Sequence, residues 1–238
     1  MNYTLEIDAN GFGATYQATL YGLAYCRKNN LDFTYKPWRS IHSTSTSDCI
    51  KFIGFHKYPL PNNQTNYIEY NCELYNSPVD DLFTDNVLKE IRDNYYSTSK
   101  PRNPYSNYIA IHIRRGDVNK KKHPTRWVEL NEYIKWIQLL KDKYPHFKIV
   151  ILSEGNKSDF KEIIDTYPDL ILDLNENSLR HFHIMVEADV LFPTLSSFSF
   201  TAGIINKNYV HRDIYDNYPF WHRPSSKCLS ILHYVNIT

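Results

Sequence analysis

The chain has 238 residues, of which 42% are hydrophobic and 22% charged, so we expect a globular protein with one large core or two small ones. Its formal net charge of +1 argues against a general nucleic-acid-binding protein, because such proteins are usually strongly basic. No signal-peptide pattern and no bilayer-length apolar run is present, so we expect a cytoplasmic protein without a membrane span. Cys26, Cys49, Cys72 and Cys228 lack metal-ligand spacing and are expected to be buried or idle thiols.

The first part of the chain predicts strands that alternate with helices. The predicted elements are a strand at residues 3–8, a helix at 14–29, a strand at 31–38, a possible strand at 49–55 and a helix at 79–96. The region from residue 39 to residue 76 is otherwise rich in Ser, Thr, Asn and Pro. Residues 97–107 are aperiodic and rich in Ser, Pro and Asn, and they are the predicted domain boundary.

The second part of the chain alternates more regularly. The predicted strands are residues 107–113, 147–153, 170–174, 189–194 and 208–212, and the predicted helices are residues 127–144, 158–167, 179–188 and 197–206. Such alternation predicts βαβ units, and therefore an α/β fold in which helices cover both faces of a parallel sheet.

The strand predicted at residues 107–113 runs into the sequence HIRRGD, residues 112–117. In an open parallel sheet, ligands bind at the carboxyl ends of the strands, which is where this sequence lies. Gly116 permits a tight turn, and the guanidinium groups of Arg114 and Arg115 match phosphate oxygens in shape and charge. The pattern favours a diphosphate ligand. Two alternatives stay open, namely local ion pairs with nearby carboxylates and an RGD adhesion tripeptide.

HIRRGD resembles the HxRRxD motif of the fucosyltransferase superfamily, which includes the α1,2-, α1,6- and protein O-fucosyltransferases. Residues 188–206, ADVLFPTLSSFSFTAGIIN, are similar to the late motif of that family, and residues 11–35 are similar to its N-terminal GxGNQ segment. Ala14 stands where the family has the asparagine of that segment.

The resemblance implies a GT-B-like architecture of two Rossmann-like domains with parallel sheets. The N-terminal domain, residues 1–100, is reduced and lies on the acceptor side, whereas residues 101–238 bind the nucleotide sugar. The implied activity is an inverting, metal-independent transfer of fucose from GDP-fucose to a glycan acceptor, without a cofactor. The chain agrees in having no DxD sequence after a strand and no HExxH.

Several residues have roles implied by the resemblance. Arg114 matches the arginine that contacts the donor β-phosphate and is the expected catalytic group, and Asp117 is expected to hold the arginines in place. The residues expected to bind the donor are Gly11, Gly13, His112, Arg114, Arg115, Asp117, Glu154, His181, Ser196, Ser197, Phe198 and Ser199. His181 stands where related enzymes place an acidic guanine contact.

Structural explanations stay open for some of these residues. His112 fits a core histidine equally well, Glu154 fits a solvated loop, and the serines at 196, 197 and 199 fit ordinary helix capping. For the general base that an inverting transfer needs, Asp8 is the first candidate, with His123 and Glu129 as others.

Two rival functions are also compatible with the sequence. The first keeps the scaffold and uses another sugar nucleotide, and the second is a non-catalytic module that binds a sugar or a nucleotide. Neither rival calls for nucleic acid or a membrane span.

Overall fold

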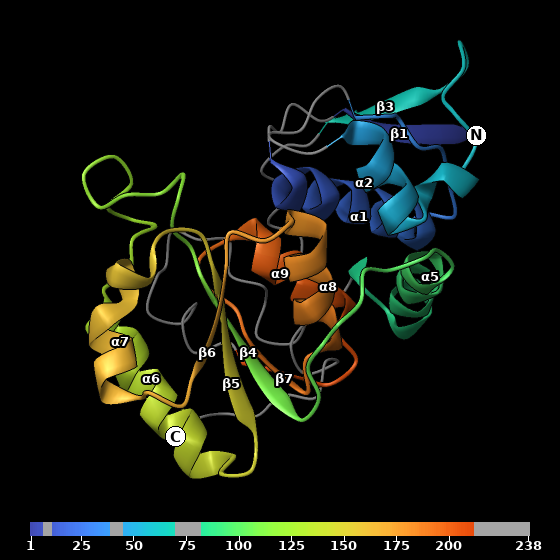
Figure 1. The fold of residues 1–238 in the computed structure, drawn as a ribbon. Coiled ribbons are helices and arrows are strands. Elements are labelled where there is room, and N and C mark those ends of the chain that lie inside the picture. The colour runs from blue at the N-terminus through green and yellow to red at the C-terminus, as the bar shows by residue number, and fades with distance from the viewer. Residues whose placement is uncertain (7–10, 39–44, 70–81, 212–238) are drawn as a thin grey trace. The chain divides into compact units, whose positions relative to one another are not determined.

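The computed structural model of the protein describes residues 1–6, 11–38, 45–69 and 82–211 (Figure 1). These residues form two compact units, one up to Pro101 and the other from Arg102. Each unit carries a parallel sheet with helices packed on it, with three strands in the first unit and five in the second. The fold class predicted from the sequence is therefore confirmed: the protein is an α/β protein with two Rossmann-like parallel sheets, of which the N-terminal one is reduced, consistent with a GT-B-like fold.

The first unit has the strand order β2-β1-β3. Its elements are β1 (Asn2–Glu6), α1 (Phe12–Lys28), β2 (Asp32–Phe33), α2 (Thr46–Ile53), a 3₁₀ turn at Phe55–Lys57, β3 (Asn66–Glu69) and α5 (Asp85–Tyr96). Helix α1 is buried over most of its circumference, because it packs against β1 and β2 on one side and contacts α5 on another. Aromatic rings fill the space around it, with Tyr16 in edge contact with Phe55 and tilted against Trp38.

One strand prediction for the first unit is wrong, and one strand is missing from the predicted elements. Residues 49–55, expected as a strand, fall in and just after helix α2, whose buried residues Cys49, Phe52 and Ile53 follow helical spacing. The helix ends at Gly54, which has a φ of +79° and lies so close to α5 that a Cβ would meet the Asn94 carbonyl oxygen at 2.0 Å. Strand β3 was not predicted, since four residues of mixed polarity carry little strand signal.

The second unit has the strand order β6-β5-β4-β7-β8, with every pair parallel. Its strands are β4 (Tyr108–Ile113), β5 (Lys148–Ser153), β6 (Ile171–Leu174), β7 (Val190–Phe192) and β8 (Tyr209–Val210), and its helices are α6 (Leu130–Lys143), α7 (Lys161–Thr166), α8 (Ser178–Glu187) and α9 (Ser197–Ile205). A 3₁₀ turn at Lys157–Phe160 precedes α7. These elements match the predicted order, with boundaries that differ by a few residues.

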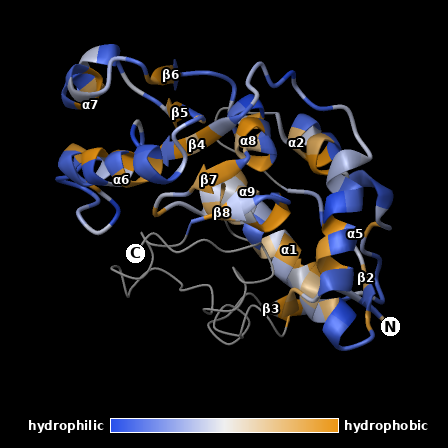
Figure 2. Cartoon of the chain, turned by 90° about the horizontal axis from the view of Figure 1, so that it is seen from below, coloured by the Kyte–Doolittle hydropathy of each residue, from blue (hydrophilic) through white to orange (hydrophobic). Residues whose placement is uncertain are grey.

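Strand β4 is buried along its whole length, which explains its nearly continuous apolar sequence. The hydroxyl of Tyr108 donates to the Ile184 carbonyl of α8, and the ring of His112 contacts Phe198 of α9, so alternate residues of β4 face α8 and α9. Helix α6 packs on the other face, where Trp136 contacts Phe192 of β7. In Figure 2, hydrophobic residues (orange) lie along β4 and β7, whereas α6 carries both hydrophilic (blue) and hydrophobic (orange) residues.

The two cysteines that the structure describes fit the prediction of buried thiols. Cys26 and Cys49 are buried and free, and burial raises their pKa values to about 11 and about 12, so both stay protonated and unreactive. Cys72 and Cys228 lie outside the described residues. Within the described part of the chain, no helix is both long enough and apolar enough to span a membrane.

Candidate functional site

The sheet of the second unit contains a point at which the order of the strands reverses. The chain passes from β4 through β5 to β6 on one side and then places β7 on the other side of β4. In open α/β sheets ligands bind at the carboxyl ends of the two strands flanking such a reversal, and this place between β4 and β7 is here named the crevice. Here HIRRGD begins in the last two residues of β4 and continues beyond the strand, and the segment Thr194–Ser199 follows β7. The fold therefore brings together two motifs about eighty residues apart in the sequence.

Arg114 lies at this crevice with its guanidinium held in a fixed orientation. Its Nη2 donates to Asp117 Oδ2 at 2.7 Å and its Nε lies 3.3 Å from Asp117 Oδ1, so the carboxylate grips one edge of the guanidinium. The remaining nitrogen, Nη1, lies 3.5 Å from Ser196 Oγ. The arginine side chain is 21% exposed, whereas that of Asp117 is 67% exposed. Asp117 therefore pre-orients Arg114, whose Nη1 edge faces the start of α9.

Arg115 has a different environment, although it is the next residue. It is buried, its Nη2 donates to the Val128 carbonyl at 2.8 Å, and its Nη1 donates to the Arg114 carbonyl. Its guanidinium also stacks over the ring of Trp127 at 3.8 Å. Burial lowers the pKa of Arg115 from its ordinary value. Arg115 thus anchors the loop that follows β4. It is Arg114, not Arg115, that pairs with Asp117.

The start of α9 supplies the second half of the crevice. Ser196 is the N-cap, and its Oγ accepts a hydrogen bond from the Phe198 N–H at 3.3 Å. Ser197 and Phe198 open the helix, where the N–H groups of the first turn and the helix dipole favour an anion. Ser199 is fully buried, and its Oγ accepts from the Thr194 N–H and lies 3.2 Å from the Thr194 carbonyl. Capping therefore accounts for Ser196 and turn formation for Ser199, while Ser197 stays accessible at the helix start.

His112 forms part of the floor of the crevice. It is 8% exposed, its ring centroid lies 5.5 Å from that of Phe198, and its Nδ1 is buried with no hydrogen-bond partner among the residues that the structure describes. Burial lowers the pKa of His112 to about 3, assisted by the charge of Arg114, so the imidazole is neutral at physiological pH. A buried polar atom without a partner is costly, and a ligand group that bonded to it would remove that cost.

Gly116 and Glu154 form the neighbouring wall. Gly116 has a φ of +76°, and a Cβ there would lie 1.8 Å from Glu154 Oε2, so only glycine fits the turn as it stands. The contact arises because β4 and β5 are adjacent parallel strands that end side by side. Glu154 is exposed at this edge and lies beside the arginine loop.

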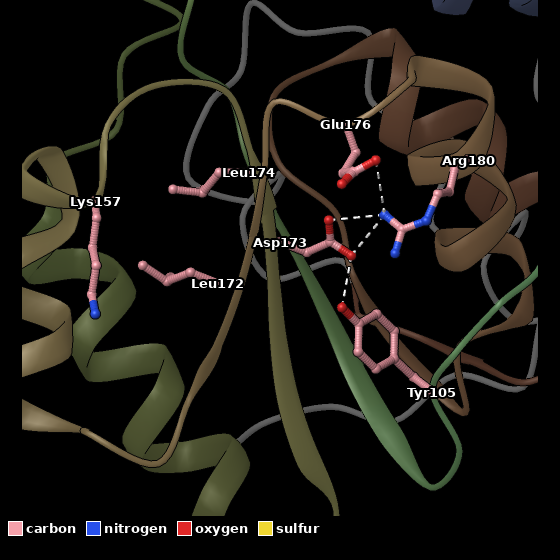
Figure 3. Close-up of a pocket in the computed structure, with 7 residues that line it drawn as sticks. All are labelled: Tyr105, Lys157, Leu172, Asp173, Leu174, Glu176 and Arg180. Atoms are coloured by element: carbon pink, nitrogen blue, oxygen red, sulfur yellow. Dashed lines mark hydrogen bonds and ion pairs between the residues drawn. The ribbon is translucent and has the colours of Figure 1, made fainter.

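His181 lies in a second cluster, on β6 and α8, that the sequence did not reveal. Its Nε2 lies 3.1 Å from Asp173 Oδ1, and burial lowers the pKa of His181 although Asp173 opposes the shift. Asp173 also accepts bonds from Arg180 Nη1 at 2.9 Å and from the Tyr105 hydroxyl at 2.7 Å (Figure 3). The signal that could have found this cluster is the single carboxylate inside the apolar strand LILDL.

A pocket of about 370 Å³ opens beside this cluster. It is lined by Tyr105, Lys157, Leu172, Asp173, Leu174, Glu176 and Arg180 (Figure 3). These residues lie around β6, which pairs only with β5 within the described ranges. The pocket is therefore at the edge of the sheet, whereas the arginine crevice is at its centre, between β4 and β7.

The remaining predicted residues lie in the first unit, in the loop after β4, or outside the described residues. Gly11 and Gly13 lie at the N-terminal end of α1 in the first unit. Asp8 lies outside the described residues. Glu129 is the N-cap residue of α6 and forms an ion pair with Lys120. His123 lies in the loop that Arg115 anchors through its hydrogen bond to the Val128 carbonyl.

Comparisons with known proteins give only distant similarity. No protein-family model matches the chain, and no curated protein matches it. Among solved structures, POFUT1 in complex with GDP has a TM-score of 0.35 and 10% identity, with 86% of this chain and 71% of that chain covered. POFUT1 in complex with GDP-fucose has a TM-score of 0.35 and 9% identity, with 87% and 70% covered. A likeness at this level carries no functional argument.

Proposed function

We propose that the protein is a glycosyltransferase that binds the diphosphate of a sugar nucleotide at the crevice between β4 and β7. The observation that carries this proposal is the convergence of Arg114 and the N-terminus of α9, where Arg114 Nη1 lies 3.5 Å from Ser196 Oγ. Charge-assisted bonds from a fixed arginine and N–H groups at a helix start are the means by which proteins bind phosphate without a metal.

The proposed donor is GDP-fucose, and the proposed reaction is an inverting transfer to a glycan acceptor. The support is the HxRRxD resemblance, the contact of Arg114 with Ser196, and the neutral His112, whose buried Nδ1 has no hydrogen-bond partner among the described residues. Arg114 then stabilises the negative charge that grows on the β-phosphate as the sugar–phosphate bond breaks. Asp8 is the proposed base for the acceptor hydroxyl.

A nucleotide panel tests the donor. We expect GDP to raise the melting temperature more than UDP or CDP, since a ligand that binds only the native state stabilises it by mass action. The measurement is a thermal shift with the three nucleotides at equal concentrations, followed by an assay for GDP release from GDP-fucose. Equal shifts, or a larger shift with UDP, would replace GDP-fucose by another sugar nucleotide. Binding of GDP without turnover would favour the non-catalytic module.

Chelation tests the role given to Arg114. If a fixed guanidinium takes the place of a divalent ion at the diphosphate, activity should be unchanged, within about a factor of two, in excess EDTA. The measurement is donor turnover before and after chelation, with Mn²⁺ and Mg²⁺ added back separately. Loss of turnover in EDTA that either ion restores would rule out metal-independent transfer.

A further inference from the structure

The N-terminal end of helix α6 makes hydrogen bonds to the loops on both sides of the crevice. Just before the helix, the Val128 carbonyl accepts a hydrogen bond from Arg115 Nη2 at 2.8 Å, in the loop that follows β4. In the first turn of the helix, the hydroxyl oxygen of Tyr133 lies 2.8 Å from Thr194 Oγ1, in the turn that follows β7. Both halves of the crevice are therefore tied to the same end of α6.

Thr194 organises the serine-rich turn that leads into α9. Its carbonyl accepts a hydrogen bond from the Ser196 N–H at 2.7 Å, and its own N–H donates to Ser199 Oγ at 3.2 Å. Ser196 in turn carries the Oγ that lies 3.5 Å from Arg114 Nη1. A displacement of Thr194 would therefore move Ser196 relative to Arg114.

The hydrogen bond between Tyr133 and Thr194 is shielded from water. Each of the two residues is only 1% exposed. The ring of Tyr133 stands perpendicular to that of Trp136, with 5.2 Å between the ring centroids, and Trp136 contacts Phe192, the last residue of β7. Packing thus fixes the ring of Tyr133, and the hydrogen bond holds its two partners firmly because neither hydroxyl can exchange the other for water.

A diphosphate site built from two loops depends on the separation of those loops. Productive geometry in a binding or catalytic site is held to within about 0.5 Å by the packing and hydrogen bonds of the residues behind it. On the basis of the function proposed above, we propose that Tyr133 is a positioning residue for the donor diphosphate site. Through Thr194 it sets the position of Ser196 opposite Arg114.

The test removes the hydroxyl of Tyr133 and keeps its ring. Tyr133→Phe should slow the release of GDP from GDP-fucose about tenfold, because small displacements of groups around a reacting centre are costly, while GDP affinity should fall less than about threefold. Thr194→Val removes the other hydroxyl and should have the same effect, and the double variant should lose less than about twofold more. Thr194→Ser keeps the hydroxyl and should retain most of the turnover.

Tyr108→Phe is the matched control. Tyr108 is also 1% exposed, and its hydroxyl donates to the Ile184 carbonyl at 2.6 Å. It is the first residue of β4, so it lies at the opposite end of that strand from the arginines. Melting curves should show a similar loss of stability for Tyr108→Phe and Tyr133→Phe, whereas Tyr108→Phe should keep its turnover and its GDP affinity, measured by calorimetry, within about twofold of the parent.

A second readout separates positioning from a general loss of stability. If Tyr133 acts through the contact between Ser196 and Arg114, its hydroxyl should matter less once that contact has been changed. Tyr133→Phe should therefore slow turnover about tenfold in the parent but less than about threefold in the Arg114→Lys background.

The outcomes separate this inference from the function on which it rests. If Arg114→Lys slows turnover and Tyr133→Phe does not, the inference is wrong and the proposed function stands. If Tyr108→Phe slows turnover as much as Tyr133→Phe, or if Tyr133→Phe has its full effect in the Arg114→Lys background, Tyr133 has a general structural role and the inference is again wrong. If the parent protein neither binds GDP nor releases it from GDP-fucose, both proposals fall.

Discussion

Arg114→Lys is expected to fold normally and to turn over its donor at least about a hundredfold more slowly than the parent, the scale of removing one preorganised donor to a developing oxyanion. Lysine keeps the positive charge but loses the planar fork. In this protein the guanidinium of Arg114 makes two contacts at once, because one edge is held by Asp117 while Nη1 faces Ser196. An ammonium cannot do both, so GDP affinity should fall only modestly while turnover falls steeply. Arg114→Ala should lose more.

The measurement is donor turnover and GDP affinity for each variant, with melting curves. Arg102→Lys, which changes an exposed arginine in the same unit, is the matched control and should behave as the parent. Arg115→Lys should lower the melting temperature rather than act on chemistry directly, since Arg115 is buried against Val128 and Trp127. Normal turnover by Arg114→Lys together with an inactive, well-folded Arg115→Lys would show that the wrong arginine has been assigned.

Asp173→Ala is expected to lower the free energy of unfolding by about 3 kcal/mol at neutral pH, the scale of removing one partner from a buried ion pair. The Asp173 side chain is 5% exposed and accepts hydrogen bonds from Arg180 and Tyr105, with His181 Nε2 at 3.1 Å. When the Asp173 carboxylate is removed, these partners stay shielded from water and lose both their hydrogen-bond acceptor and their counter-charge. Asp165→Ala, which removes an exposed carboxylate paired with Lys161, is the control and should cost less than about 1 kcal/mol.

The effect of Asp173→Ala should depend on pH with a defined sign. Burial alone would raise the pKa of Asp173, but its bonds to Arg180, Tyr105 and His181 lower it below its ordinary value. A carboxylate with a lowered pKa contributes stability above the pKa of the unfolded chain, about 3.9, and this contribution is lost as the pH falls through the folded-state value. The difference between parent and variant should therefore be full at pH 7 and shrink below about pH 4. Urea unfolding at several pH values measures it, and a difference that grew in acid would contradict the assignment.

The sequence alone was enough to predict the second sheet and the ends of its strands. The nearly continuous apolar run of β4 is typical of a parallel strand covered on both faces, and such strands alternate here with helices of ordinary length. Short elements with mixed polarity were less predictable. Helix α2 was predicted as a strand because its few apolar residues fit both periods, and β3 was missed.

For the site, the sequence by itself determined that HIRRGD would leave a buried strand and that the serine-rich turn would open a helix, because both follow from local apolar patterning and capping. Only the tertiary structure decided what each side chain does. Successive residues leaving a strand point to opposite faces, so Arg114 reaches Ser196 at α9, whereas Arg115 turns to Val128 and Trp127. The partners of Asp173 likewise depend on contacts between residues far apart in the sequence, and local patterning does not encode such contacts.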